Sequence, residues 1–167
     1  MTDPDQPDRV EYRMERTFSV AATPEQVWDA IATAEGIAAW MVPVRLDPRI
    51  GGEVSFDHGA FRSTGGVTAY SPNQRFSYEE PWPMTEAMRG WVARATGHEV
   101  TDHDLSLVTP IATEFLIEAA SGGSCVIRVV SSAYGSGADW EKEFFDEMAA
   151  GWIAMLDNLT AHLHTAP

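Results

Sequence analysis

The C-terminal part of the chain carries the pattern that most constrains the fold. From about Ala138 to His162, large apolar side chains recur at steps of three and four residues, while polar residues such as Glu141 occupy much of the opposite face. This spacing predicts a long amphipathic helix, which must lie across an apolar surface supplied by the rest of the chain. The apolar stripe comprises Phe144, Phe145, Met148, Trp152, Met155, Leu156, Leu159 and Leu163.

The rest of the chain predicts that surface as an antiparallel sheet. Residues 10–20 alternate between apolar and polar side chains, and short strands follow in "VRLD", "EVSFD", "FRSTGGVTAYS" and "RFSYEE". A hairpin around "SGG" closes the series. Two short helices precede this run, the first with Thr23 as N-cap, Pro24 at its first position and Gln26 completing a capping box. Grouped strands with helices at the ends indicate an α+β fold, a curved sheet gripping the last helix.

The domain organisation expected from this order is simple. Residues 1–9, rich in proline and aspartate, are expected to form a disordered lead-in, and residues 10–164 a single domain. An extra segment at about residues 81–108 separates "RFSYEE" from the next strand. Within it Thr85 is placed as an N-cap, so a short helix is expected there.

Composition excludes several classes of function. The 167 residues carry a formal charge of −14, which repels nucleic acid, and no basic stripe offsets it. No apolar run approaches the roughly 18 residues of a membrane span, and the acidic start of the chain is not expected to act as a signal peptide. The single cysteine, Cys125, allows no internal disulfide framework and favours a cytoplasmic location.

Three stretches carry a family resemblance: "ATPEQVWDAIATAEGIAAWM", "RIGGEVSF" and "GWIAMLDNLTAHL". In order and spacing they resemble the SRPBCC (START/Bet v 1-like) superfamily, and within it the activator-of-Hsp90-ATPase-like (AHSA1-like) branch. The resemblance implies a helix-grip fold, in which a seven-stranded antiparallel sheet wraps around the C-terminal helix and usually leaves a cavity between them. It implies no catalytic residue and no cofactor for this chain.

The resemblance leads us to expect binding of a small hydrophobic or amphipathic molecule between the sheet and the C-terminal helix. The extra segment is rich in tryptophan and methionine, which suit a cavity wall because they offer large, adaptable apolar contacts. A homodimer contact or plain packing would use the same residues. The expected ligand-binding residues are Trp40, Met41, Phe56, Tyr78, Trp82, Met88, Trp91, Phe115, Phe145, Met148, Trp152 and Arg16.

Arg16 interrupts the apolar face of the first strand, so its side chain would face the helix. A charge in that position needs a partner. Three explanations remain open: a bridge to an acidic residue, a guanidinium that reaches water at the sheet margin, or an anchor for an anionic ligand.

Other functions have weaker support in the sequence. A cyclase- or hydrolase-type enzyme would use cavity groups such as His58, Tyr70, Tyr78, Tyr134 or Ser131, but no nucleophile elbow, phosphate loop or dinucleotide fingerprint is present. A chaperone-related protein-interaction module is a further alternative. The cluster "HEVTDHD", residues 98–104, is expected to be a solvated polar turn in a loop, and no metal site is assigned.

Overall fold

The computed structural model describes residues 9–165, so all but the last residue of the expected lead-in lies outside the described residues. Residues 9–165 form one antiparallel sheet and five helices. The strands are β1 (Val10–Val20), β2 (Val44–Leu46), β3 (Glu53–Asp57), β4 (Arg62–Ser71), β5 (Arg75–Glu80), β6 (Ile111–Ala119) and β7 (Cys125–Gly135). The helices are α1 (Pro24–Ile31), α2 (Ala34–Trp40), α3 (Glu86–Thr96), α4 (Asp102–Ser106) and α5 (Asp139–Thr165).

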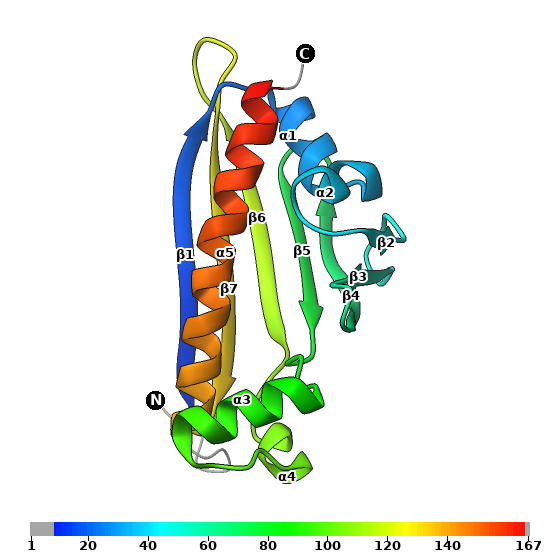
Figure 1. Cartoon of the computed structure of the whole chain (residues 1–167). Coiled ribbons are helices and arrows are strands. Elements are labelled where there is room, and N and C mark those ends of the chain that lie inside the picture. Colours follow the sequence, from blue (N-terminus) through cyan, green and yellow to red (C-terminus); the bar gives the residue numbers. More distant parts are fainter. Residues whose placement is uncertain (1–8, 166–167) are drawn as a thin grey trace.

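The sheet has the order β1-β7-β6-β5-β4-β3-β2, with every neighbouring pair antiparallel. β1 closes one edge by pairing with β7 over its whole length, from Val10 opposite Gly135 to Val20 opposite Cys125. The helix α5 lies along the face of this sheet, with α1 and α2 beside its C-terminal end and α3 across its N-terminal end (Figure 1). The expected seven-stranded helix-grip fold is confirmed.

Local signals in the sequence explain the first two helices. Thr23 accepts a hydrogen bond from the Gln26 amide, and the Gln26 side chain accepts one from the Thr23 amide, so the expected capping box is present. Thr33 caps α2 in the same way by accepting from the Gly36 amide. These caps fix the residue at which each helix starts.

Most of the apolar stripe of α5 is buried as expected: Phe144, Phe145, Trp152, Leu156 and Leu159 all belong to the core, whereas Met148 and Met155 are partly buried. None of the described helices combines the length and apolar character needed to cross a bilayer. One expectation for α5 was wrong.

Glu141, assigned to the polar face, is fully buried. Its carboxylate accepts hydrogen bonds from the Tyr12 hydroxyl at 2.9 Å, from the amide and hydroxyl of Ser136 at 3.1 and 2.6 Å, and from the Gly137 amide at 3.0 Å. Helical periodicity could not reveal this, since the partners come from β1 and from the connection between β7 and α5.

The segment at residues 81–108 contains α3 and α4. Thr85 caps α3 by accepting from the Met88 amide, as expected. The polar cluster at residues 98–104 was expected to be a loop, and this was wrong in its second half. Asp102–Ser106 is helical because Thr101 and Asp104 form a reciprocal capping box. The boundaries of the inserted segment, and the single-domain organisation, stay predictions.

Candidate functional site

A partly open cavity of about 230 Å³ lies between the sheet, α3 and the middle of α5. Its lining combines one large apolar surface with a small polar group. The lining residues are Met41, His58, Phe61, Ser63, Glu80, Pro83, Met88, Ile111, Phe144, Glu147, Met148, Gly151, Trp152 and Met155.

Four methionines and one tryptophan dominate the apolar surface of the cavity. Met41 is the C-cap residue of α2, Met88 comes from α3, and Met148, Trp152 and Met155 come from α5. All four methionines are only partly buried. Unbranched thioether side chains adapt to irregular shapes, so this surface can fit apolar groups of different outline.

The polar side of the cavity is formed by Ser63 of β4 and Glu80 at the end of β5. The Ser63 hydroxyl donates a short hydrogen bond to the Glu80 carboxylate. Burial raises the pKa of the Glu80 carboxyl above its ordinary value, and the hydrogen bond from Ser63 only partly opposes this. Within residues 9–165, no basic side chain forms an ion pair with Glu80.

His58 is the third polar group in the cavity, and its ring stacks on Phe61 with centroids 4.7 Å apart. Burial lowers the pKa of His58, although the nearby Asp57 carboxylate acts in the opposite direction. The neutral imidazole is therefore favoured. The other acid–base groups considered from the sequence do not line this cavity: Tyr134 is exposed, and Ser131 is buried in the sheet against Thr113.

Four of the expected binding residues, Met41, Met88, Met148 and Trp152, are brought together in the cavity. Four others line a second space of about 10 Å³, which shares Met41 with the cavity and is too small for an organic ligand. These four are Trp40, Phe56, Tyr78 and Phe115. Whether any of them contacts a ligand stays a prediction.

Trp82 and Phe145 lie outside the cavity lining, in an aromatic cluster at the N-terminal end of α5. The Trp82 ring meets Trp140 at 5.5 Å and Phe144 at 5.6 Å between centroids, and Phe145 packs on Tyr12 at 5.6 Å. The Trp82 indole donates to the Thr109 carbonyl at 2.7 Å. The cluster closes this end of the molecule as packed core.

Trp91 and Arg16 are also placed away from the cavity. Trp91 is half-buried on α3 and packs against the core. Arg16 lies opposite the buried Val129, on the face expected from parity, yet its side chain is exposed in a groove beside Asp157 and Thr160 of α5. No ion pair of Arg16 occurs within the described residues. This placement matches the guanidinium that reaches water at the sheet margin.

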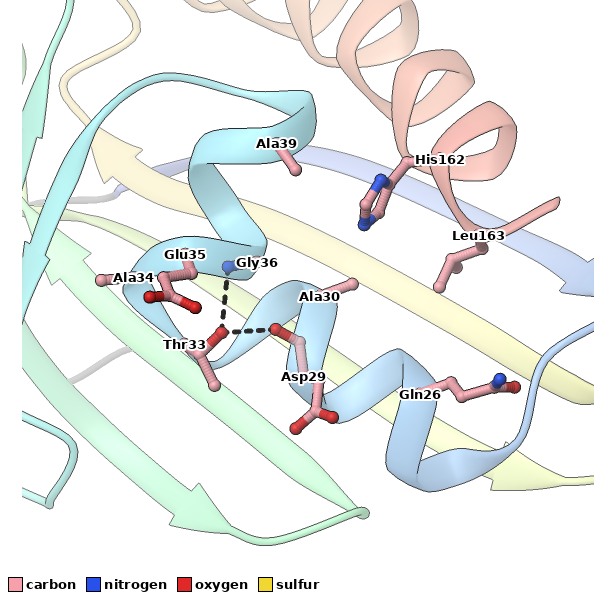
Figure 2. A pocket seen from close by; sticks show the side chains of 10 residues that line it. All are labelled: Gln26, Asp29, Ala30, Thr33, Ala34, Glu35, Gly36, Ala39, His162 and Leu163. Atoms are coloured by element: carbon pink, nitrogen blue, oxygen red, sulfur yellow. Dashed lines mark hydrogen bonds between the residues drawn. The ribbon is translucent and has the colours of Figure 1, made fainter. Parts of the chain in front are cut away.

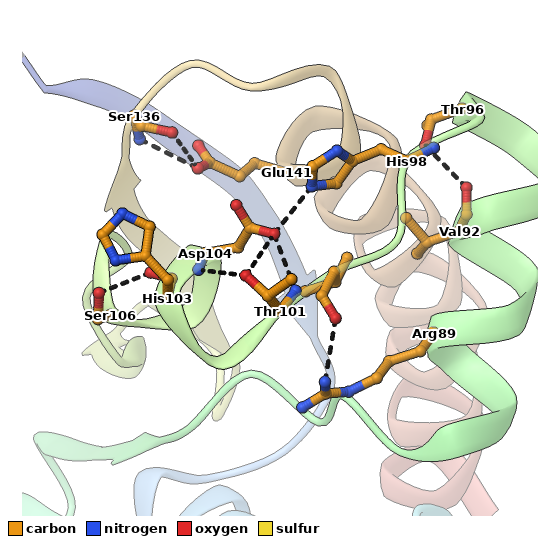
Figure 3. Close-up of polar contacts among 11 residues, drawn as sticks. Arg89, Val92, Thr96, His98, Thr101, His103, Asp104, Ser106, Ser136 and Glu141 are labelled. Carbon is orange, nitrogen blue, oxygen red and sulfur yellow. Dashed lines mark hydrogen bonds and ion pairs between the residues drawn. The ribbon is translucent and has the colours of Figure 1, made fainter.

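The polar cluster of residues 98–104 stabilises the connection between α3 and α4. His98 bonds Asp104 at 2.8 Å (Figure 3). Arg89 of α3 donates to the Val100 carbonyl at 3.0 Å and pairs with Asp102 at 3.2 Å. Within residues 9–165, no group of three or more His, Cys, Asp or Glu side chains converges to hold a metal ion. His98, Asp102 and Asp104 of this cluster are thus paired within the segment itself.

A larger surface groove, of about 670 Å³, lies between α1, α2 and the C-terminal end of α5 (Figure 2). Small or polar residues line it, among them Ala30, Thr33, Ala34 and Ala39, and the Thr33 hydroxyl is already bonded to the Asp29 carbonyl and the Gly36 amide. Polar atoms make up a much larger share of its surface than of the smaller cavity's surface. The smaller cavity is therefore the better candidate site, since binding sites are mainly apolar with a few polar groups.

Among the cavity residues that were not expected to bind a ligand, Glu80 and Gly151 each had a signal in the sequence. Glu80 shares strand parity with Phe76 and Tyr78, which are both buried, so alternation places its carboxylate on the inner face. Gly151 interrupts a long helix without ending it. A Cβ at Gly151 would meet no atom within 4 Å, so this glycine leaves open space beside the cavity.

The comparisons with solved structures show the fold. The chain resembles the Aha1 dimer from Colwellia psychrerythraea at 17% identity and a TM-score of 0.67, covering 92% of this chain and 97% of that one. It resembles protein MLL2253 from Mesorhizobium loti at 13% identity and a TM-score of 0.68, covering 93% of this chain and 99% of that one. Truncated norcoclaurine synthase from Thalictrum flavum is similar at 14% identity and a TM-score of 0.59, with 98% of this chain and 99% of that one covered.

A search of curated proteins gives no match. The family model described as Activator of Hsp90 ATPase homolog 1-like protein matches residues 21–164, from the end of β1 almost to the end of α5. That range takes in α1 and α2, the methionine-lined cavity and nearly the whole of α5. The chain therefore belongs to the Activator of Hsp90 ATPase homolog 1-like family.

Proposed function

We propose that this protein binds a small hydrophobic or amphipathic molecule in the cavity between β4, β5, α3 and α5. The observation that carries the proposal is the composition of the lining, in which Met41, Met88, Met148, Met155 and Trp152 surround a space of about 230 Å³. A folded chain normally fills its interior to crystal-like density, so a partly open apolar space of this size supports a role in binding.

Apolar burial provides enough affinity for such a role. A ligand that hides roughly 250 Å² of apolar surface gains about 6 kcal/mol before the costs of association. The methionines supply contact area, and the group formed by Ser63 and Glu80 orients the ligand. The cavity is smaller than the roughly 300–1,000 Å³ typical of drug-sized ligands, which favours a small molecule or one end of a longer one.

The first test of binding is native mass spectrometry of the protein purified from its own organism, repeated after denaturation. A bound mass of a few hundred daltons that is lost on unfolding supports a carrier and begins to identify its cargo. Repeated apo masses, together with no response of the protein's tryptophan fluorescence to apolar probes, would contradict the proposal.

Gly151→Leu tests the location of the site. Because a Cβ at Gly151 meets open space, leucine there is expected to occupy the cavity mouth without displacing backbone. We expect probe affinity to fall about tenfold or more, equal to about 1.4 kcal/mol. Fluorescence titration with an environment-sensitive apolar probe measures this.

Ala154→Leu is the matched control for this variant. It adds the same side chain to an exposed position of α5 that does not line the cavity. Its affinity should match that of the wild type. Equal affinity of Gly151→Leu and wild type would show that the probe binds elsewhere.

An enzymatic role is a second candidate, because the cavity contains two groups whose pKa values move in opposite directions. Burial raises the pKa of Glu80 and lowers that of His58. Such pairs are typical of acid–base sites. The test is turnover of a bound ligand that His58→Gln abolishes while binding persists; a ligand recovered unchanged after prolonged incubation argues for simple binding.

A homodimer stays a prediction for this chain. The similar protein from Colwellia psychrerythraea is described as a dimer. Sedimentation of wild type and Trp91→Ala distinguishes a dimer contact from packing within one chain, since only a contact shifts the monomer–dimer equilibrium.

A further inference from the structure

We propose that the cavity selects ligands with a cationic head group, such as a protonated amine, which pairs with the Glu80 carboxylate while the apolar body lies against the methionines. This inference rests on the proposed function and specifies the class of ligand. It follows from the partners of Glu80, from the charges around the cavity and from the chemistry of its wall.

Glu80 has unused capacity for hydrogen bonding. A carboxylate offers about four acceptor positions. Within residues 9–165, the Glu80 side chain uses one of its oxygens, for the bond from Ser63. The buried Glu141 accepts four hydrogen bonds and shows what complete pairing looks like in this chain. Glu80 therefore remains available to a donor that enters the cavity.

Much of the desolvation of Glu80 is part of folding and not of binding. The side chain is already partly buried when the empty cavity forms, so a cationic ligand displaces less water from this carboxylate than from an exposed one. Preorganisation of this kind makes a buried ion pair favourable, whereas two freely solvated partners would each lose hydration.

The surroundings favour cations and disfavour anions. Neither lysine nor arginine contributes to the lining, and Glu147 adds a second carboxylate from α5. His58, the remaining titratable group there, is favoured as the neutral imidazole. The chain as a whole has a formal charge of −14. A carboxylate ligand such as a fatty acid would meet Glu80 and Glu147 without a compensating cation.

The apolar wall suits the same ligand. Trp152 lines the cavity and offers an aromatic face that attracts cations. The thioethers of Met148 and Met155 accept alkyl groups next to it. A cationic amphiphile can thus satisfy both parts of the lining, with its charged end at Glu80 and its apolar end at α5.

Three probes with one shared chain test the inference: octylamine, 1-octanol and octanoate, titrated at pH 7 by isothermal calorimetry below their aggregation concentrations. We expect octylamine to bind about tenfold more tightly than octanol, because a charge-assisted hydrogen bond is stronger than a neutral one. Octanoate should bind more weakly than octanol by a similar factor. Glu80→Gln should bring the ratio of amine to alcohol affinity close to one.

Glu79→Gln is the matched control, since it removes the same charge from the neighbouring exposed position of β5. It should leave the ratio as in the wild type. If the ratio falls equally in both variants, the preference comes from overall charge and the role of Glu80 is overturned. If Glu80→Gln folds poorly, the comparison of the three probes on the wild-type protein still tests the inference.

The outcomes separate this inference from the proposed function. Equal binding of the three probes overturns cation selection and leaves the binding cavity in place. Tighter binding of octanoate overturns it more strongly. Failure of all three probes to bind, together with an apo mass for the native protein, overturns the proposed function as well.

Discussion

The N-terminal end of α5 and its middle are built from similar groups but differ in how completely those groups are paired. At the end, Trp82, Trp140 and Phe144 interlock, and Glu141 is fully buried with four hydrogen bonds. In the middle, methionines border an open cavity, and Glu80 accepts one hydrogen bond from Ser63. The first region stabilises the fold, whereas the second leaves bonding capacity for a ligand.

Residues of the aromatic cluster and methionines of the cavity lining should differ most in their contribution to the free energy of unfolding. Trp82→Ala removes a packed indole and its bond to the Thr109 carbonyl, so we expect a loss of about 3–5 kcal/mol in the free energy of unfolding. Met148→Ala, at a half-buried position beside existing space, should cost about 1 kcal/mol. Urea denaturation measures both, and equal losses would show that the cavity wall is packed as tightly as the cluster.

The completeness of pairing at Glu141 can be tested next. Glu141→Ala leaves the Tyr12 hydroxyl and the amides of Ser136 and Gly137 without their acceptor, so we expect a loss of about 2–4 kcal/mol. Glu143→Ala, an exposed position of the same helix turn, should stay within about 0.5 kcal/mol of wild type. A loss below that of Met148→Ala would mean that water replaces the carboxylate easily.

Glu80 should behave in the opposite way. Its pKa is raised by burial, so the folded state binds the proton more tightly than the unfolded state, and stability falls as pH rises through the raised pKa. Glu80→Gln removes this loss. We expect the variant to gain about 0.5–2 kcal/mol over wild type at neutral pH, as is common when functional strain is removed.

The gain from Glu80→Gln should disappear below the ordinary carboxyl pKa, where both proteins are neutral at this position. His58 and Glu147, the other titratable groups of the cavity, are unchanged in the variant and cancel in the comparison. Thermal unfolding of both proteins from pH 4 to pH 8 measures this difference in stability. A variant less stable than wild type throughout would show that the carboxylate is a structural group like Glu141.

The sequence by itself determined most of the elements and the fold class, although the short helix α4 was missed. Capping residues such as Thr23 and Thr85 act through neighbours three positions away, and the stripe of α5 depends on helical spacing alone. Local hydrogen bonds and periodic burial are encoded within short windows, so one chain is enough to predict them. The gathering of Met41, Met88, Met148 and Trp152 in one cavity was predicted in part, since the helix-grip resemblance implied that their elements meet.

Only the tertiary structure decided which apolar residues line a cavity and which fill the core. Phe115 and Trp152 contact each other at 6.1 Å between ring centroids, yet Trp152 alone of the two borders the larger space. The tertiary structure also decided how completely each glutamate is paired. Glu141 accepts a hydrogen bond from Tyr12, 129 residues away in the chain, and Glu80 accepts one from Ser63 on the neighbouring strand β4. Pairing and empty volume depend on how distant elements approach one another, and no local pattern in the sequence encodes that distance.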